Sequence, residues 1–325
     1  MTFAKAINTG LRAALERDPK VMLMGEDIGT LGGVFRVTDG LAKDFGTDRV
    51  VDTPLAESGI VGTAIGLALR GYRPVCEIQF DGFIFPAFDQ ITTQLSKMHY
   101  RSRGRLTLPV VIRVPYGGGI GAVEHHSESP EVLFAHTAGL RVVSPSDPQD
   151  AYTMIQQAIA SPDPVLFFEP KGRYWEKGDV DTDADAVAAP STLDGARVLR
   201  PGTDVTLVAH GPTVATALKV ADAAAAEGRS VEVVDLRAIS PLDVGTVVES
   251  VRRTGRCVVV HEAPVLYGTG AEVAARVTEE CFYHLEAPVL RVGGFHTPYP
   301  VAKLEHEYLP GLDRVLDAVD RVLAH

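Results

Sequence analysis

Cysteine and positive charge are both scarce in this chain of 325 residues. The three cysteines are odd in number and far apart in the sequence, which excludes a disulfide framework and a zinc cluster with paired ligand spacing. Lysine and arginine number 31 against 42 aspartates and glutamates, so the formal net charge is −11. Because phosphate binding needs a local excess of positive charge, this balance argues against nucleic acids and anionic membranes as partners.

Long apolar runs and export signals are also missing. The first residues lack the apolar run of a secretion signal, which predicts a cytoplasmic protein. The stretch from Ser58 to Leu69 is apolar and free of charge, but it is too short for a bilayer-spanning helix, which takes about 20 residues. The chain contains no P-loop, H-E-x-x-H or G-x-S-x-G pattern, which excludes the common ATPases, zinc proteases and serine hydrolases.

The remaining sequence is organised in two blocks. In each block, short apolar strands alternate with helical patterns, which predicts two doubly wound α/β domains with mostly parallel sheets. Residues 171–200 are polar and turn-rich and then acidic, as is typical of a surface linker, with the junction near Pro190. We therefore expect domains at residues 1–180 and 201–325, joined by a linker at 181–200.

The apolar patterns give approximate bounds for these elements. Strands are expected at residues 21–24, 50–54, 74–80, 110–114, 142–143, 164–168, 205–209, 231–236, 257–260 and 289–292. Helices are expected at residues 2–17, 58–69, 86–100, 213–227 and 270–284, with two more that end near residue 45 and begin near residue 241. The helix at 58–69 is expected to be buried, because its small residues offer a face for close packing, namely Gly59, Gly62, Ala64 and Gly66.

Glu57 is the most informative candidate for chemistry. It follows an expected strand and stands at the head of the apolar, Gly-rich helix. A carboxylate in the first turn of a helix is the ordinary complement of the helix dipole. In the functional interpretation, apolar neighbours raise its pKa, so that it shares a proton with a ligand nitrogen.

A Gly-rich loop with two adjacent histidines follows the expected strand at 110–114. Residues 117–122 match a dinucleotide pattern, but Pro115 interrupts the junction and no acidic partner ends a next strand. A loop over a ligand or a tight surface turn fits better. His125 and His126 point apart, which argues against a metal site, whereas a loop histidine can exchange protons near neutral pH.

Three phenylalanines, Phe80, Phe83 and Phe85, lie three and two residues apart around Gly82, and such a group is more typical of a core than of a cofactor site. The residues alone thus predict a two-domain α/β protein with a ligand site near Glu57, Phe83 and His126. They do not identify the ligand.

Taken in order along the chain, the motifs resemble the β subunits of 2-oxo acid dehydrogenase E1 components. The motifs occupy residues 24–29, 32–38, 52–62, 77–80, 85–91, 126–130, 142–145, 167–171, 234–237, 241–243 and 297–300. The resemblance implies a transketolase-like fold, with a pyrimidine-binding domain followed by a transketolase C-terminal domain. Within the family, residues 85–91 and 126–131 look most like the branched-chain 2-oxo acid enzymes.

The resemblance implies a thiamine diphosphate enzyme that decarboxylates a 2-oxo acid and transfers the acyl group to the lipoamide of an E2 acyltransferase. Glu57 matches the carboxyl group that hydrogen-bonds N1′ of the cofactor's aminopyrimidine. Phe83 matches an aromatic residue that packs near this ring, where branched-chain relatives often have Tyr. His126 matches the active-site histidine that assists acyl transfer.

The resemblance also implies partners and ions. The Gly-Asp-Gly motif that holds magnesium and the diphosphate in the family is absent, which implies a separate α subunit in an α₂β₂ assembly. Family β subunits hold a potassium ion through backbone carbonyls. The matching positions are Val110, Ala158, Ile159, Ser161 and Asp163. The C-terminal domain resembles the part that docks E2, with His296 where relatives usually carry Asp.

Three alternatives stay open at this point. The nearest is the same role on pyruvate. The second is a nicotinamide-dependent Rossmann dehydrogenase that uses the loop at 117–122, although its context argues against this. The third is a non-catalytic scaffold that docks E2, which the presence of Glu57 and His126 disfavours.

Overall fold

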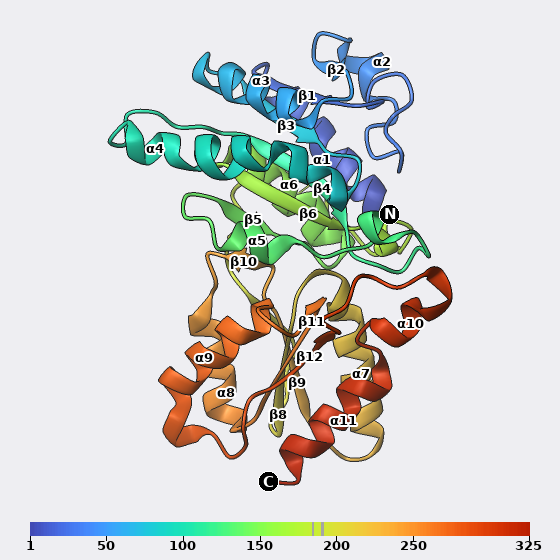
Figure 1. The fold of residues 1–325 in the computed structure, drawn as a ribbon, viewed down its shortest axis with the longest axis vertical. Helices are drawn as coiled ribbons and strands as arrows, with labels where there is room; N and C mark the ends of the chain where they lie inside the picture. Colours follow the sequence, from blue (N-terminus) through green and yellow to red (C-terminus); the bar gives the residue numbers. More distant parts are fainter. Residues whose placement is uncertain (184, 190–191) are drawn as a thin grey trace. The chain divides into compact units, whose positions relative to one another are not determined.

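The computed structural model describes residues 1–183, 185–189 and 192–325. Two compact units are present, and each is built from strands and helices in layers (Figure 1). The first unit comprises residues 1–116 and 133–193, and the second comprises residues 117–132 and 194–325. Pro190, near the expected junction, lies outside the described residues. The prediction of two α/β units with mostly parallel sheets is confirmed.

The first unit contains a parallel sheet whose strands run in the order β5-β6-β4-β3-β1-β2. The strands are β1 (Val21–Gly25), β2 (Val50–Asp52), β3 (Arg73–Glu77), β4 (Val111–Tyr116), β5 (Arg141–Val143) and β6 (Val165–Pro170). Every residue of β4 and β6 is buried. This is why these strands appear in the sequence as continuous apolar runs rather than as alternating patterns.

Helices cover this sheet. They are α1 (Phe3–Arg17), α2 (Leu41–Phe45), α3 (Glu57–Leu69), α4 (Met98–Arg101) and α6 (Pro148–Ala160), and the short α5 (Glu131–Ala135) contains the chain boundary between the units. Helices α1 and α6 pack together, and α3 packs on β3 (Figure 1). The expected strands and the helix at 2–17 are confirmed to within a few residues, whereas α6 was not predicted.

Helix α3 exposes the three glycines that the sequence predicts to be buried, whereas Ala64 of the same predicted face is buried. Its buried residues are Ile60, Val61, Ala64, Ile65 and Ala68, together with Glu57. The glycines Gly59, Gly62 and Gly66 are exposed, and a Cβ placed at Gly62 or Gly66 would meet no atom within 4 Å. The larger apolar side chains therefore face the sheet of this unit, and the small face is open.

The helix expected at residues 86–100 is instead an irregular helical run. It consists of a 3₁₀ segment η1 (Asp81–Ala87), a π-helical turn η2 (Gln90–Gln94), a 3₁₀ turn η3 (Leu95–Lys97) and α4. Pro86 lacks an N–H group for a helical hydrogen bond. In addition, the hydroxyls of Thr92 and Ser96 donate to the carbonyls of Phe88 and Thr92, and such back-bonding distorts a helix.

Part of the expected surface linker belongs to the core of the first unit. Lys171, in the 3₁₀ turn η5 (Lys171–Arg173), and Tyr174 are fully buried. Lys171 donates to Asp81 over 2.5 Å, and neither side chain is exposed. A buried lysine is stable because a carboxylate compensates its charge, and sequence polarity alone could not predict this pairing.

The second unit contains a sheet in the order β12-β11-β8-β9-β7, in which only the edge pair β7–β9 is antiparallel among the pairings of the described residues. Its strands are β7 (Arg197–Arg200), β8 (Val205–Ala209), β9 (Val231–Asp235), β11 (Cys257–Pro264) and β12 (Leu290–Gly294), and a further short strand is β10 (Ala238–Ser240). The edge strand β7 was not predicted from the sequence.

Helices lie on both faces of this sheet, with α7 and α11 on one face and α8 and α9 on the other (Figure 1). The helices are α7 (Val214–Ala226), α8 (Val244–Thr254), α9 (Thr269–Cys281), α10 (Glu305–Tyr308) and α11 (Leu312–Leu323), with 3₁₀ turns η4 (Glu124–His126), η6 (Gly211–Thr213), η7 (Phe282–His284) and η8 (Ala302–Leu304). One core cluster lies on each face. In the described part of the chain, no helix has both the length and the apolar character to cross a membrane.

Candidate active site

The carboxyl ends of β1, β2 and β3 lie at one edge of the first unit's sheet, because these strands are parallel neighbours. Glu26 follows β1, Glu57 follows β2 after a short turn, and Phe83 follows β3. The turns are joined, since the Thr53 N–H donates to the Gly25 carbonyl over 2.9 Å. This edge is where open α/β sheets bind ligands.

Glu57 is the first residue of α3, and its exposed fraction is only 7%. The N-cap residue Ala56 has no side-chain oxygen, so the carboxylate of Glu57 is the acidic complement of this helix end. Glu26 is also buried. Burial, followed by the negative charges of Glu57 and Asp27, raises the pKa of Glu26. The two carboxyl groups are therefore coupled by charge.

Among the residues that the structure describes, Glu26 Oε1 and Thr53 Oγ1 at this edge are buried and have no hydrogen-bond partner. Such orphan atoms are the groups that a polar ligand or water satisfies. Glu57 was predicted from the sequence as a site residue, whereas Glu26 was not. A signal was present, because residues 25–27 form a polar turn after a buried strand, but only the fold couples Glu26 to Glu57.

Phe83 is half-buried and belongs to a series of aromatic contacts. Its ring centroid lies 6.0 Å from that of Phe80, Phe80 lies 5.5 Å from Phe35, and Phe35 lies 4.9 Å from Tyr174. The prediction that Phe80, Phe83 and Phe85 line a core is wrong, since Phe85 is 40% exposed and the other two are half-buried. The 3₁₀ geometry of η1 places every third residue on one face, so alternate residues do not share one.

A buried ion cluster supports this edge from β3, β4 and β6. Arg113 donates from Nη1 to Glu77 over 2.6 Å, and from Nε and Nη2 to the two oxygens of Glu169 over 2.6 and 2.9 Å. Tyr174 donates to Glu169 over 2.6 Å. At Gly33, where φ is +79°, a Cβ would lie 2.9 Å from Glu77 Oε1, so the Gly-rich turn after β1 lies directly on the cluster.

His126 lies in the second unit, on η4, whereas Glu57 and Phe83 belong to the first unit. Its Nδ1 is 2.8 Å from the backbone oxygen of His125. Because a carbonyl can only accept, Nδ1 carries the proton of the neutral ring, and Nε2 is the nitrogen that accepts a proton. This tautomer suits a general acid or base that acts through Nε2.

The five positions matched to a potassium ion lie near the C-terminus of α6 and the start of β4. Their carbonyls already accept hydrogen bonds in this chain. The donors are Val165 N for Val110, Ser161 N for Ala158, Arg73 Nη1 for Ile159 and Ser161, and Ser161 Oγ for Asp163. Each carbonyl oxygen has a second lone pair, so the potassium site stays a prediction. Among the described residues, no group of three His, Cys, Asp or Glu side chains is placed to hold a metal ion.

Residues 1–176 match the family model of the transketolase pyrimidine binding domain, and residues 194–315 match that of the transketolase C-terminal domain. A pyruvate dehydrogenase E1 component subunit beta of Leifsonia xyli is 63% identical over 325 residues, covering 100% of this chain and 95% of that protein. A 3-methyl-2-oxobutanoate dehydrogenase subunit beta of Mycobacterium tuberculosis is 55% identical over 324 residues, covering 99% and 92%. The chain belongs to the transketolase-like E1 β subunits of the 2-oxo acid dehydrogenases.

The E1 β family depends on thiamine diphosphate, and its members work with an E1 α subunit. This assignment replaces the nicotinamide-dependent alternative. A split gene transketolase, solved as an inactive beta4 tetramer, matches this E1 β chain with a TM-score of 0.81 at 26% identity, covering 100% of this chain and 98% of that one. Some relatives are named as pyruvate enzymes and others as branched-chain enzymes. One of the latter is a 2-oxoisovalerate dehydrogenase subunit beta of Pseudomonas aeruginosa, which is 44% identical over an alignment that covers 99% of this chain and 95% of that protein.

Proposed function

We propose that this chain is the β half of an E1 enzyme that decarboxylates branched-chain 2-oxo acids and transfers the acyl group to E2 lipoamide. The observation that carries the proposal is the buried carboxyl group of Glu57 at the head of α3, coupled by charge to Glu26. Thiamine diphosphate, when bound, supplies the electron sink that 2-oxo acid decarboxylation requires. The buried orphan oxygens at this edge fit its polar aminopyrimidine.

In this proposal the chain's residues divide the work. Glu57 would hold the proton at N1′ of the aminopyrimidine, and its negative charge helps to raise the pKa of the neighbouring Glu26. Phe83 supplies a flat apolar surface for the ring. His126 gives or takes a proton through Nε2 while the acyl group is transferred to lipoamide.

The preference for a branched substrate is supported by residues 85–91. Phe85 and Phe88 in this motif are 40% and 37% exposed, and their rings stack with centroids 6.5 Å apart. An apolar surface of this kind favours a branched acyl chain, because burial of each additional methyl group stabilises the complex. The second candidate is pyruvate as substrate, which the name of the 63% identical relative favours.

The α subunit is the partner that completes the proposed enzyme, with magnesium and the diphosphate bound on its side in an α₂β₂ assembly. The exposed face of α3 supports a partner there. Gly59, Gly62 and Gly66 are exposed on it, with Leu69 44% exposed and the preceding Leu55 80% exposed. Small residues beside exposed leucines allow another backbone to approach closely and bury apolar surface. Potassium in the β subunit and E2 docking near His296 remain part of the proposal.

The first experiment is to co-express the chain with its candidate α subunit and to measure decarboxylation with thiamine diphosphate and magnesium. Preference for 3-methyl-2-oxobutanoate over pyruvate would support the branched-chain proposal. Preference for pyruvate would leave the family assignment intact but make pyruvate the substrate. A stable α–β complex with no turnover of either substrate would favour the scaffold alternative.

The role of Glu57 is tested by Glu57→Gln in the same complex. Gln retains the size of the side chain but cannot hold the exchanged proton, so decarboxylation should fall about a hundredfold or more. Asp48→Asn, an exposed change in the same unit, is the matched control and should retain full activity. Normal turnover by Glu57→Gln would remove this residue from the proposed chemistry.

A further inference from the structure

The Gly-rich loop that precedes His126 is bound by two carboxylates of the second unit. We define the glycine loop as residues 117–122. The Gly118 N–H donates to Glu262 Oε2 over 2.9 Å, and the N–H groups of Gly119 and Gly121 donate to Glu305 over 3.0 and 3.1 Å. Hydrogen bonds to a charged acceptor are stronger than those between neutral groups.

The backbone of the glycine loop is shaped for these acceptors. Gly117, Gly119 and Gly121 all have positive φ, at +78°, +93° and +68°. Turns of this kind direct successive N–H groups into one concavity, which binds an anion. A Cβ on Gly117 would lie 2.6 Å from Glu262 Oε2, and a Cβ on Gly118 would overlap the hydroxyl of Tyr299. The loop therefore requires glycine both for its conformation and for the close approach of its acceptors.

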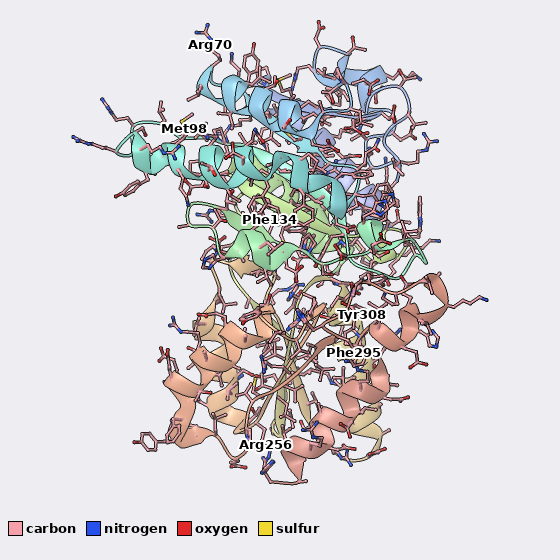
Figure 2. The ribbon with its side chains drawn as sticks, viewed as in Figure 1. Arg70, Met98, Phe134, Arg256, Phe295 and Tyr308 are labelled. Atoms are coloured by element: carbon pink, nitrogen blue, oxygen red, sulfur yellow. The ribbon has the colours of Figure 1, made fainter. Side chains whose placement is uncertain are left out.

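Glu305 is itself held in place. The hydroxyl of Tyr299, in the motif at 297–300, donates to Glu305 Oε1 over 2.9 Å. The ring of Tyr299 packs on Tyr308, with centroids 4.9 Å apart, and both side chains are buried. Figure 2 labels Tyr308 and Phe295, whose centroids are 6.3 Å apart, in the segment that leads into α11. Burial, followed by the neighbouring Glu305, raises the pKa of Tyr299, so its hydroxyl remains a donor.

The glycine loop is closed upon the turn that carries His126. The Gly117 N–H donates to the Glu128 carbonyl over 3.0 Å, and the His126 N–H donates to the Val123 carbonyl over 3.0 Å. The amides held by Glu305 and the imidazole thus belong to one closed loop of the chain. Displacement of the Gly119 and Gly121 amides would therefore change the position of the His126 imidazole.

We infer that Glu305, oriented by Tyr299, is a positioning residue that fixes the glycine loop and so places His126 for acyl transfer to lipoamide. The inference rests on the proposed role of His126 in that transfer. It gives the motif at 297–300 a function within the second unit, which is to orient one carboxylate toward the loop's amides.

The test compares Glu305→Ala with Glu305→Gln in the assembled α–β enzyme. Amide hydrogen exchange of residues 117–128 should accelerate about tenfold or more in Glu305→Ala, because two amides lose a charged acceptor. Acyl transfer to a lipoyl domain should fall about tenfold, while decarboxylation with an artificial electron acceptor should change less than about twofold. Glu305→Gln keeps an acceptor oxygen and should restore part of both properties.

Glu307→Ala is the matched control, since Glu307 lies on the same short helix and is 74% exposed. It should leave exchange and both activities unchanged. Tyr299→Phe, which removes only the hydroxyl that orients Glu305, should give a smaller effect in the same direction and remains informative if Glu305→Ala fails to fold.

The two readouts separate failure of the inference from failure of the proposed function. Unchanged amide exchange in Glu305→Ala would overturn the fixing of the loop, whatever the enzyme does. Faster exchange with equal losses in both assays would overturn the specific link to acyl transfer. His126→Ala is measured in parallel. Normal acyl transfer by that variant would overturn the proposed role of His126, whereas the exchange experiment would still test whether Glu305 fixes the glycine loop.

Discussion

The molecule buries polar side chains in two opposite ways, and each unit contains a clear example of one of them. In the first unit, Arg113 is fully buried and its guanidinium is bonded to two carboxylates, Glu77 and Glu169. In the second unit, Glu131 and His210 are just as deeply buried, but within the described part of the chain their carboxyl oxygens and ring nitrogens make no hydrogen bond to another residue. The buried groups around Arg113 keep their charge because opposite charges pair, whereas burial of Glu131 and His210 favours their uncharged forms.

In the first unit, opposite charges compensate the loss of water. Burial alone would lower the pKa of Arg113, but the charges of Glu169 and Glu77 outweigh this effect and hold the pKa above its usual value. Burial raises the pKa of Glu77 more than the charge of Arg113 lowers it. Arg113 therefore stays charged at the centre of the cluster, and its charge offsets part of the cost of burying Glu77.

In the second unit, the groups are neutral at physiological pH. Burial, the largest cause, raises the pKa of Glu131 to about 8, lowers the pKa of His210 to about 3, and lowers the pKa of His261 to about 4. His210 Nε2 lies 3.8 Å from Glu131 Oε1. This contact is not an ion pair, because both groups are uncharged. Because Glu131 and His210 titrate at different pH values in the folded and unfolded chains, their contribution to the free energy of unfolding varies with pH. The contribution of the paired charges around Arg113 should vary less between about pH 4 and 8.

The largest expected effect comes from breaking the paired charges. Arg113→Met fills a similar volume but leaves Glu77 and Glu169 buried without their cation, so the free energy of unfolding should fall by about 3–5 kcal/mol. Chemical denaturation of the variant measures this loss. Arg12→Gln, which removes a partly exposed pair with Asp44, is the control and should cost at most about 1 kcal/mol. Equal losses in the two variants would contradict the comparison.

The next effect is acid sensitivity from the buried imidazole of His210. The unfolded chain protonates this ring below pH about 6.5 while the folded protein does not, so stability falls as the pH falls toward 3. His210→Phe should remove about 3 kcal/mol of the stability lost between pH 6.5 and 4. Urea midpoints at these two pH values provide the measurement. His284→Gln, an exposed histidine of the same unit, should leave the loss unchanged.

A smaller effect of opposite sign comes from Glu131. The folded protein retains its carboxyl proton up to pH about 8, whereas the unfolded chain releases it near pH 4.3, so stability falls as the pH rises through this range. Between pH 6.5 and 8 the loss should be about 2 kcal/mol. Glu131→Gln should flatten this part of the profile, as measured by thermal denaturation. A wild-type slope in the variant would show that Glu131 is already ionised when folded.

The sequence predicted the strands well and the environments of particular residues poorly. Apolar runs located β4, β6 and β8 to within a few residues, because strands buried on both faces need apolar side chains throughout. Polar residues 171–200 were assigned to the surface, yet Lys171 and Tyr174 are buried. Their partners, Asp81 and Glu169, come from other elements, and local pattern carries no information on such contacts.

The candidate site shows the same division. Glu57 and His126 were selected from the sequence, Glu57 by its place between a strand and an apolar helix and His126 by its polar loop. Glu26 and Glu305 were missed. Their roles depend on contacts with residues far along the chain, in the case of Glu305 with amides that lie 186 and 184 residues away.

The sequence by itself determined most of the strands, the alternation of strands and helices in two blocks, and the family to which the chain belongs, because these features are written in local apolar periodicity and in short motifs. Only the tertiary structure decided which buried groups keep their charge. Arg113 meets carboxylates 36 and 56 residues away, whereas His210 lies in surroundings that favour its neutral form. The physical reason is that the pKa of a buried group depends on the water it loses and the charges it gains, and folding determines both.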